Sequence, residues 1–366
     1  MISTDERDAL LVSMDTAWQQ AAAAARATGS FHRRDLLLAD VPVRLDVAGD
    51  ALADIVFPAY EVHPSTDLAP SVHLEAYDAA ATGAPMPAEP GPIAPGQWAG
   101  IHDWPAEPGR PAARWYARNH HGQAFVHVEG GPDRFAVADA PFGPWWERGA
   151  PLRQPLSWAL AGPDTTFLHA AAVGRPDGVA LLVGAGGAGK SSTALSSLVG
   201  GLHFIGDDYC ILRLGDEPVV HTLFGVAKVA PDQLDGIDPD GVLRPHIIDP
   251  GVVHEDPEDQ MITKAVIATS RWEGGRFLAH APVRVVVVPD RAAPPGLTRM
   301  AGAEGLRHLA PTSLFQLRGE QADSLRLQAA MLRRVPCYRL GLLPDRQANP
   351  PVIEQLLADL AAGRTP

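Results

Sequence analysis

GVALLVGAGGAGKSSTALSSLVGGLHFIGDDYCILRL, residues 178–214, is the stretch that decides the expected fold. Its apolar start predicts a buried strand, and a glycine-rich loop then leads into a segment over about 190–199 that predicts a helix. A second apolar run over 203–214 predicts the return strand. The order strand, loop, helix and strand is typical of an α/β domain.

Segments on both sides extend this pattern. Apolar runs over 167–173 and 283–288 predict two more buried strands, and residues 301–334 and 351–362 have helical spacing. We therefore expect residues 151–366 to form one α/β domain around the glycine-rich loop.

The loop itself predicts nucleotide binding, because residues 184–191 fit the pattern G-x-x-x-x-G-K-[ST] in full. Its glycines can adopt positive φ, so successive backbone N–H groups can surround a phosphate at the start of the following helix. Lys190 would reach the β- and γ-phosphates, the Ser191 hydroxyl would bind Mg²⁺, and Ser192 would add a phosphate contact. The residues expected to bind ATP and Mg²⁺ are Gly184, Gly186, Gly187, Ala188, Gly189, Lys190, Ser191 and Ser192.

A pair of acids, Asp207 and Asp208, ends the apolar stretch HFIG, 17 residues after Lys190. A helix of about ten residues and a return strand would bring the pair to the same edge of the sheet as the loop. One carboxylate there can hold Mg²⁺, directly or through water, and another can accept a proton from an attacking hydroxyl.

The N-terminal part has a different character. Residues 5–28 predict a helix, short β-branched runs over 35–62 predict strands, and the Pro/Gly-rich stretch 80–112 predicts an irregular loop. Strands are again expected at 114–118, 124–128 and 134–138. We expect residues 1–150 to form a β-rich (α+β) domain. This domain would recognise the molecule that carries the attacking hydroxyl, the acceptor, through tryptophans such as Trp98, Trp104 and Trp115. The alternative is that it only covers the apolar face of the second domain.

Composition excludes several classes of function. The chain has 366 residues, with 30 basic and 43 acidic ones and a net charge of −13, so we expect no nucleic-acid partner. Two distant cysteines exclude a disulfide scaffold or a cysteine-rich zinc module. The N-terminus has early acids and no apolar h-region of a signal peptide, and no stretch approaches 18 uninterrupted apolar residues. We therefore expect a cytoplasmic protein without a membrane partner. The oligomeric state stays open.

Only three of the 30 basic residues are lysines. A surviving lysine can mark a place where a compact ammonium is needed and a planar guanidinium would not serve. Lys228 and Lys264 are therefore candidates to neutralise charge on a transferring phosphoryl group, with Arg318 and Arg339 as further candidates. Each of these residues is equally well explained as surface charge.

The segments FLHAAAV, GAGGAGKSSTALSSL and HFIGDDYCIL, which lie within about 167–214, resemble the catalytic core of the HPr kinase/phosphorylase family. The family includes relatives that phosphorylate peptide precursors. The resemblance implies a PEP-carboxykinase-like P-loop fold and ATP-dependent phosphorylation of a serine on a protein or peptide. It also implies Asp207 as catalytic base, Asp208 beside the metal with Ser191, and His169 and Lys190 in the catalytic site.

The chain departs from this family after the aspartates. VVHTLFGVAKV (219–229) stands where the family has an E-x-R-G-L-G-type signature, so the resemblance implies neither HPr as the acceptor nor the reverse phosphorolysis. We expect an ATP-dependent kinase that acts on a hydroxyl, first of all a serine. The alternatives are a small-molecule hydroxyl kinase and an ATP-dependent binding or assembly factor that transfers no phosphate.

Overall fold

The computed structural model describes residues 4–88, 100–118, 122–142, 145–251, 264–317, 319 and 321–365. The chain forms two compact units. Unit 1 comprises Met1–Phe57 and His63–Ala159, and unit 2 comprises Pro58–Val62 and Leu160–Pro366. The division therefore lies after Ala159 and not after residue 150, and a five-residue segment from the N-terminal part belongs to unit 2.

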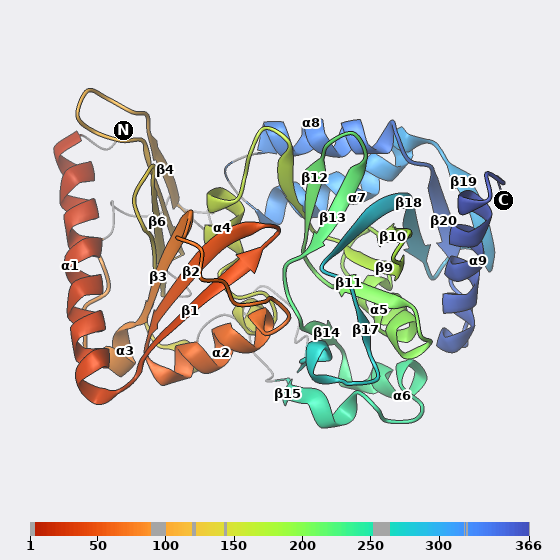
Figure 1. The fold of residues 1–366 in the computed structure, drawn as a ribbon, viewed down its shortest axis with the longest axis horizontal. Coiled ribbons are helices and arrows are strands. Elements are labelled where there is room, and N and C mark those ends of the chain that lie inside the picture. Colours follow the sequence, from red (N-terminus) through yellow and green to blue (C-terminus); the bar gives the residue numbers. More distant parts are fainter. Residues whose placement is uncertain are drawn as a thin grey trace. The chain divides into compact units, whose positions relative to one another are not determined.

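Among the described residues, unit 1 contains one seven-stranded sheet with the order β1-β2-β3-β7-β6-β5-β4 (Figure 1). β2, β3 and β7 are parallel to one another, and the other neighbours are antiparallel. The strands are β1 (Phe31–Leu38), β2 (Val41–Ala48), β3 (Val72–Asp78), β4 (Gly100–Trp104), β5 (Ala113–Arg118), β6 (Gln123–Val128) and β7 (Asp133–Val137).

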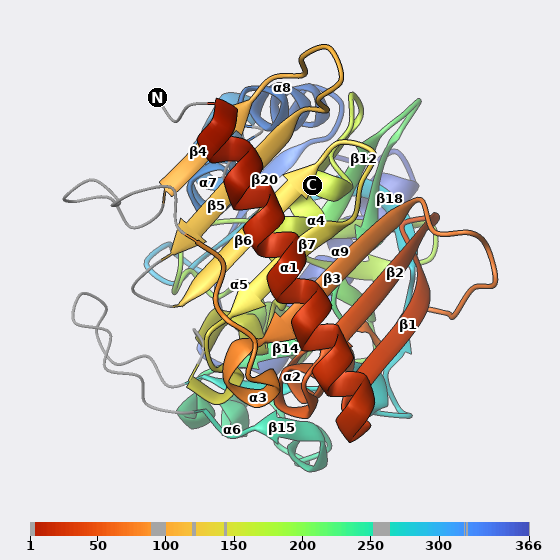
Figure 2. The ribbon, with the colours of Figure 1, turned by 90° about the vertical axis from the view of Figure 1, so that its left-hand side faces the viewer.

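Helices cover both faces of this sheet. α1 (Thr4–Thr28) runs diagonally across one face, as Figure 2 shows, and its alanine-rich side packs on Tyr77 and Trp115. On the other face, α4 (Arg153–Ala159) places the Trp158 ring 4.7 Å from the Phe125 ring. The remaining helices of the unit are α2 (Asp50–Tyr60), whose last turn belongs to unit 2, and α3 (Ala79–Thr82).

Two expectations for the N-terminal part are wrong. Residues 54–60 belong to α2 and form no strand, because a short apolar run fits a buried helix as well as a strand and Pro58 falls in its last turn. The Pro/Gly-rich stretch contains β4, an edge strand, and α3, while residues 89–99 lie outside the described residues. Trp98 is among them.

Within its described residues, unit 2 contains a ten-stranded sheet with the order β17-β11-β9-β10-β18-β13-β12-β8, in which β20 also pairs with β18 and β19 with β20. A separate three-stranded sheet has the order β14-β16-β15. The strands are β8 (Thr165–Leu168), β9 (Ala171–Arg175), β10 (Gly178–Leu182), β11 (His203–Gly206), β12 (Cys210–Leu214), β13 (Pro218–Thr222), β14 (Ala227–Val229), β15 (Ile247–Asp249), β16 (Ala265–Ile267), β17 (Arg276–Phe277), β18 (His280–Asp290), β19 (Gly296–Met300) and β20 (Cys337–Gly341).

Alternation along β10 distributes its side chains to two cores. Ala180 and Leu182 pack in a cluster with residues of α5 (Lys190–Val199) and α9 (Asn349–Ala361), whereas Val179 and Leu181 pack in another with residues of α7 (Gly302–Gln316) and α8 (Gln321–Leu332). The sheet is therefore covered by helices on both faces, and unit 2 is an α/β domain. A short helix, α6 (Leu234–Ile237), lies beside α5.

The direction of the strands brings their ends together. β10, β18 and β20 are parallel, and β11 runs the same way because β9 is antiparallel to both β10 and β11. The segments that follow β10, β11, β18 and β20 therefore all leave the sheet at one edge. This edge contains the glycine-rich loop.

Two predicted strands are interrupted at this edge. The run 167–173 breaks at His169 into β8 and β9, and the run 203–214 breaks at Asp207 into β11 and β12. Asp208 has a φ of 66°, in the left-handed region that aspartate tolerates better than most residues, and the chain turns there. The predicted helix over 301–334 is likewise two helices, α7 and α8.

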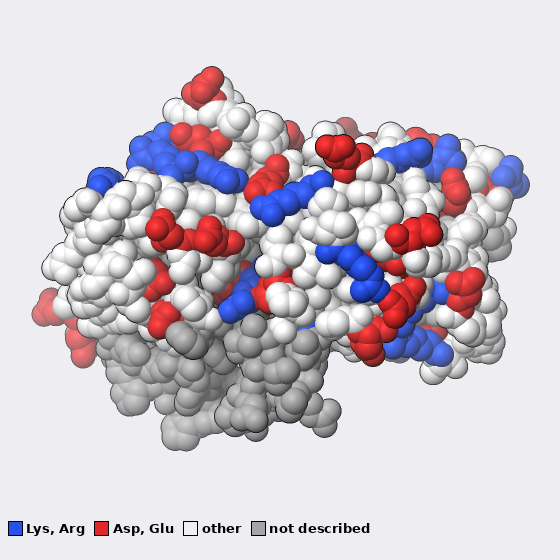
Figure 3. Space-filling model, turned by 90° about the horizontal axis from the view of Figure 1, so that it is seen from below, with Lys and Arg blue, Asp and Glu red and all other residues white. Residues whose placement is uncertain are grey.

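Charges are mixed over the surface seen in Figure 3, where acidic and basic side chains alternate among the described residues. Among the described residues of the whole surface, several acidic and basic side chains form ion pairs, as Arg284 with Glu217 and Arg110 with Asp8. In the part of the chain that the structure describes, none of the helices combines the length and the apolar character needed to cross a bilayer.

Candidate functional site

The glycine-rich loop connects β10 to α5 and is built to surround an anion. Gly187 and Gly189 have φ values of 82° and 110°, which residues other than glycine rarely adopt. A Cβ at Gly186 or Gly187 would meet no atom within 4 Å, so the space in front of the loop is open. Gly189 is the N-cap of α5 and no side chain caps this helix end, so its first N–H groups remain available to a ligand.

Lys190 lies across the mouth of the loop. Its Nζ donates to the carbonyl oxygen of Gly184 at 2.7 Å and to that of Ala185 at 3.2 Å, and the residue is 6% exposed. Burial lowers the pKa of Lys190, while the charges of Asp208 and Asp207 raise it. The two aspartates therefore act on this ammonium as partners across the site.

Asp208 lies between two other site residues. Its Oδ1 is 3.3 Å from Nε2 of His169, and its Oδ2 forms an ion pair with Nζ of Lys228, a buried lysine of β14. Burial would raise the pKa of Asp208, but the Lys228 ammonium and the hydrogen bond from His169 hold it well below 3.8. Burial lowers the pKa of His169 against the opposing effect of Asp208. Asp208 is therefore a fixed negative charge.

Asp207 has a different environment. It is 1% exposed, its Oδ2 accepts a hydrogen bond from the Lys228 backbone N–H at 3.3 Å, and its Oδ1 has no hydrogen-bond partner among the described residues. Burial and then the charge of Asp208 raise the pKa of Asp207 to about 6. Hydrogen bonds from the Ser191 side chain and from the backbone of Lys228 and Asp208 act in the opposite direction and lower this pKa. A buried carboxylate oxygen without a donor is suited to receive a proton or a cation.

These residues fit a nucleoside triphosphate with Mg²⁺. The loop offers backbone donors and an ammonium for phosphates, and the Ser191 hydroxyl and two carboxylates are oxygen ligands of the kind that Mg²⁺ prefers. The free Oδ1 of Asp207 is the observation that tests this fit, because an orphaned buried acceptor beside Ser191 calls for a cation or a proton that a bound ligand brings to the site.

The structure brings some predicted residues together and separates others. The charge of Lys264 lowers the pKa of Lys190, and Lys228 pairs with Asp208, so all three lysines of the chain act on the same group of charges. Arg339 instead pairs with Glu304 at 2.7 Å and lies 3.8 Å from Asp290. Arg318 lies outside the described residues. The Ser192 hydroxyl donates to Oε1 of Gln233 at 2.8 Å.

Sequence reasoning missed three side chains beside the loop: Gln233, Arg291 and Arg346. They meet at Gln233, whose Oε1 also accepts from Arg291 at 3.4 Å and from Arg346 at 3.3 Å. A signal for Arg291 exists in the sequence, since it comes three residues after the predicted buried strand at 283–288, where the chain is expected to leave the sheet at one of its edges. No local pattern marks Gln233 or Arg346.

A second group of metal-binding residue types lies in unit 1. Asp46, His73 and Glu75 have ligand atoms within 4.8 Å of one another. However, Arg33 binds Asp46 through two hydrogen bonds of 2.6 and 2.7 Å, and Arg134 binds Glu75 at 2.8 Å. The carboxylates are already neutralised by guanidinium groups, so the cluster is best explained as a cross-strand ion-pair network.

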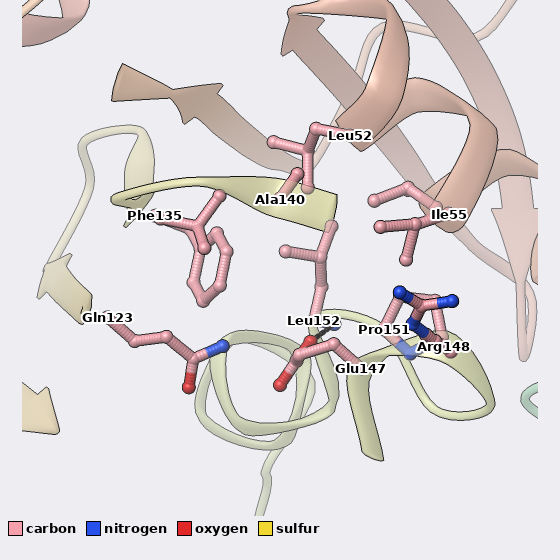
Figure 4. A pocket seen from close by; sticks show the side chains of 11 residues that line it. Leu52, Ile55, Gln123, Phe135, Ala140, Glu147, Arg148, Pro151 and Leu152 are labelled. Carbon is pink, nitrogen blue, oxygen red and sulfur yellow. Dashed lines mark hydrogen bonds between the residues drawn. The ribbon is translucent and has the colours of Figure 1, made fainter. Parts of the chain in front are cut away.

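A small pocket also lies in unit 1 (Figure 4), between α2, the strands β6 and β7 and the segment that leads to α4. Its walls are mostly apolar, and Gln123, Glu147 and Arg148 are its polar side chains. Nε2 of Gln123 is buried without a hydrogen-bond partner among the described residues. The expected recognition surface, by contrast, loses Trp115, which is fully buried under α1.

Comparisons with known proteins leave the family open. No protein-family model matches the chain, and no curated protein matches it. Among solved structures, the chain is similar to the Hpr(Ser) kinase/phosphatase from Coxiella burnetii, with 12% sequence identity and a TM-score of 0.29. The match covers 54% of this chain and 92% of that one. A TM-score of this size supports no conclusion about activity. Any proposal about activity therefore rests on the residues of the site.

Proposed function

We propose that the protein is an ATP-dependent phosphotransferase that phosphorylates a hydroxyl, most specifically a serine of a peptide or protein. The observation that carries this proposal is the convergence of Lys190, Asp207 and Asp208 at the edge of the sheet where β10 and β11 both end. A loop that only binds a nucleotide needs the lysine and the backbone donors. Two carboxylates beside them, the buried Asp207 and the partly buried Asp208, are what phosphoryl transfer adds.

In this proposal each side chain has a separate task. Lys190 and the N–H groups of the loop and of α5 hold the phosphates and neutralise their charge. Mg²⁺, held by Ser191 and Asp208, would supply further neutralisation of the transferred group. Asp207 receives the proton of the acceptor hydroxyl at its unpartnered Oδ1, and His169 and Lys228 keep Asp208 in place.

The acceptor class rests on other grounds. The motif resemblance to HPr kinase-like enzymes favours serine in a peptide or protein over a small molecule. We assign acceptor recognition to unit 1, where the buried amide of Gln123 faces a mostly apolar pocket that suits a side chain with an apolar body and one polar group.

Calorimetric titration with Mg·ATP tests the nucleotide site. Lys190→Ala should weaken binding about tenfold or more, because a charge-assisted phosphate contact is worth roughly 1.5–3 kcal/mol. Arg284→Ala is the matched control, since this exposed arginine pairs with Glu217 and the Asp177 carbonyl far along β18 from the loop. Unchanged affinity in Lys190→Ala would refute the site.

A second experiment tests transfer. The protein is incubated with γ-labelled ATP and pools of peptides, proteins and small hydroxyl compounds, and the label is located by mass spectrometry. Label on a serine supports the proposal, and label on a small molecule supports the alternative of a small-molecule hydroxyl kinase. Binding without any label in the presence of every pool would favour a factor that transfers no phosphate.

A further inference from the structure

Two arginines face each other beside the loop with one neutral oxygen between them. Oε1 of Gln233 accepts from Nη2 of Arg291 at 3.4 Å and from Nη1 of Arg346 at 3.3 Å. The same oxygen accepts from the hydroxyl of Ser192, in the first turn of α5. The amide oxygen of Gln233 therefore joins both guanidinium groups to the phosphate loop.

The two arginines lie where strands end. Arg291 follows β18, and Arg346 stands in the short 3₁₀ helix Arg346–Ala348 after β20, while both strands run parallel to β10. A Cβ placed on Gly189, the last glycine of the loop, would lie 3.9 Å from Nε of Arg291. Figure 1 shows β10, β18 and β20 in the same sheet, with α5 beginning at this edge.

Their charge is not balanced by acids. Within the described residues, neither Arg291 nor Arg346 has a carboxylate within ion-pair distance. By contrast, Arg271, Arg284 and Arg339 of the same unit each pair with a glutamate. Burial and then the charge of Arg291 lower the pKa of Arg346, whereas the negative charge of Asp232 acts to raise it. Two like charges held close together are favoured when an anion lies between them.

The order of the strands says which part of a nucleotide would lie here. Asp207 and Asp208 follow β11, which is separated from β10 by β9 on one side of the loop, and β18 and β20 lie on the other side. The phosphate to be transferred has to face the aspartates. The rest of the nucleotide therefore extends towards β18 and β20, beginning with the phosphate nearest the ribose.

We propose that Arg291 and Arg346, positioned by Gln233, bind the α-phosphate of the nucleotide together with Ser192. This rests on the proposed function. Guanidinium groups suit the task because their paired N–H donors match phosphate oxygens. The arginines would give the site its preference for a nucleotide over a free inorganic phosphate compound.

The test compares three ligands by calorimetry with the full chain: Mg·ATP, ADP and inorganic pyrophosphate with Mg²⁺. Arg291→Gln, Arg346→Gln and the double variant are measured against Arg284→Gln, an arginine near the other end of β18. Each single variant should weaken ATP and ADP about tenfold, the effect of one charge-assisted contact. Pyrophosphate, which can occupy the two positions next to Lys190, should lose less than about threefold, and Arg284→Gln should bind all three ligands as the unmodified protein does.

The outcomes separate this inference from the proposed function. Double-variant binding of ATP at the original affinity, with Lys190→Ala still impaired, would overturn the arginine site alone. An equal loss for pyrophosphate and ATP would also overturn it, because the arginines would then act by shaping the loop. Failure of the unmodified protein to bind Mg·ATP would overturn both. Arg291 is exposed, so Arg291→Gln keeps the test valid even where Arg346→Gln folds poorly.

Discussion

Asp207 and Asp208 are neighbours with opposite environments, and the difference decides what each can do. Asp208 has a partner on each oxygen, whereas Asp207 keeps Oδ1 without one among the described residues. A carboxylate that is already held by Lys228 and His169 is suited to remain charged. A buried carboxylate with a free oxygen is suited to take a proton.

Asp207→Asn should therefore leave the affinity for Mg·ATP within about threefold and lower the rate of phosphoryl transfer by about 100-fold or more, the usual size of a lost general base. Rate and affinity are measured on the same preparation once an acceptor is known. Strong loss of Mg·ATP binding in this variant would instead make Asp207 a metal ligand beside Ser191. Full turnover would remove it from the mechanism.

Lys228 should prove to be a structural requirement of the same pair. Lys228→Met leaves the charge of Asp208 buried without its cation, which costs about 3–5 kcal/mol of the free energy of unfolding. Urea denaturation measures this loss. Adding Asp208→Asn removes the uncompensated charge, so the double variant should recover most of the stability; if it does not, the ion pair is not the cause.

At the scale of elements, the β6 and β7 strands of unit 1 carry a pair whose strength depends on pH. Nδ1 of His127 lies 2.7 Å from Oδ1 of Asp133, and this hydrogen bond raises the pKa of His127 against burial and Arg114. Burial raises the pKa of Asp133 as well. The imidazolium therefore stabilises the fold below its unfolded pKa of about 6.5, and the stabilisation is lost as pH rises through the higher folded value.

The difference in unfolding free energy between the unmodified protein and His127→Gln should be larger at about pH 6 than at about pH 8.5. Urea unfolding at the two pH values measures it. His102→Gln on β4 is a control of opposite sign, because burial lowers the pKa of His102 and its protonation opposes folding. Equal differences at both pH values for His127→Gln would contradict the assignment.

The elements also show how far sequence reasoning reaches. The loop, α5 and the buried strands around them were predictable because glycines, a lysine and an apolar run at fixed spacing form a local pattern. The breaks at His169 and Asp207 were not, because apolar residues stand on both sides of each, and the second break depends on the left-handed backbone of Asp208. Arg291 has a signal at the end of a predicted strand, but its meeting with Gln233 and Arg346 was out of reach, since strand order, not spacing, brings the three together.

At the scale of the whole molecule, unit 2 depends on a segment from the first sixty-odd residues. Tyr60 is fully buried with its ring 5.6 Å from that of Phe224, and Gly225 donates its N–H to the carbonyl of Ala59 at 2.7 Å. Glu61 pairs with Arg271 at 2.7 Å. A fragment that starts near residue 155 would lack all three contacts. A loss of stability or activity in such a fragment could therefore not be assigned to the absence of unit 1.

Tyr60→Ala should cost about 3–5 kcal/mol of unfolding free energy, the range for removing a large buried ring. Glu61→Ala, which breaks a partly exposed ion pair, should cost less than about 1 kcal/mol. Thermal and urea unfolding compare the two. A Tyr60→Ala variant as stable as Glu61→Ala would mean that the segment Pro58–Val62 contributes little to the stability of unit 2.

The interaction of all three lysines with one group of charges has a practical consequence for handling the protein. Amine-reactive dyes, cross-linkers and sensor surfaces normally attach at random exposed lysines, but Lys190 and Lys228 are buried here. Such reagents are left with the N-terminal amine and the half-buried Lys264, whose charge acts on Lys190. Immobilisation through amines would thus tether the chain partly through Lys264, and protection of Lys264 by ATP would itself report that the proposed nucleotide site is filled.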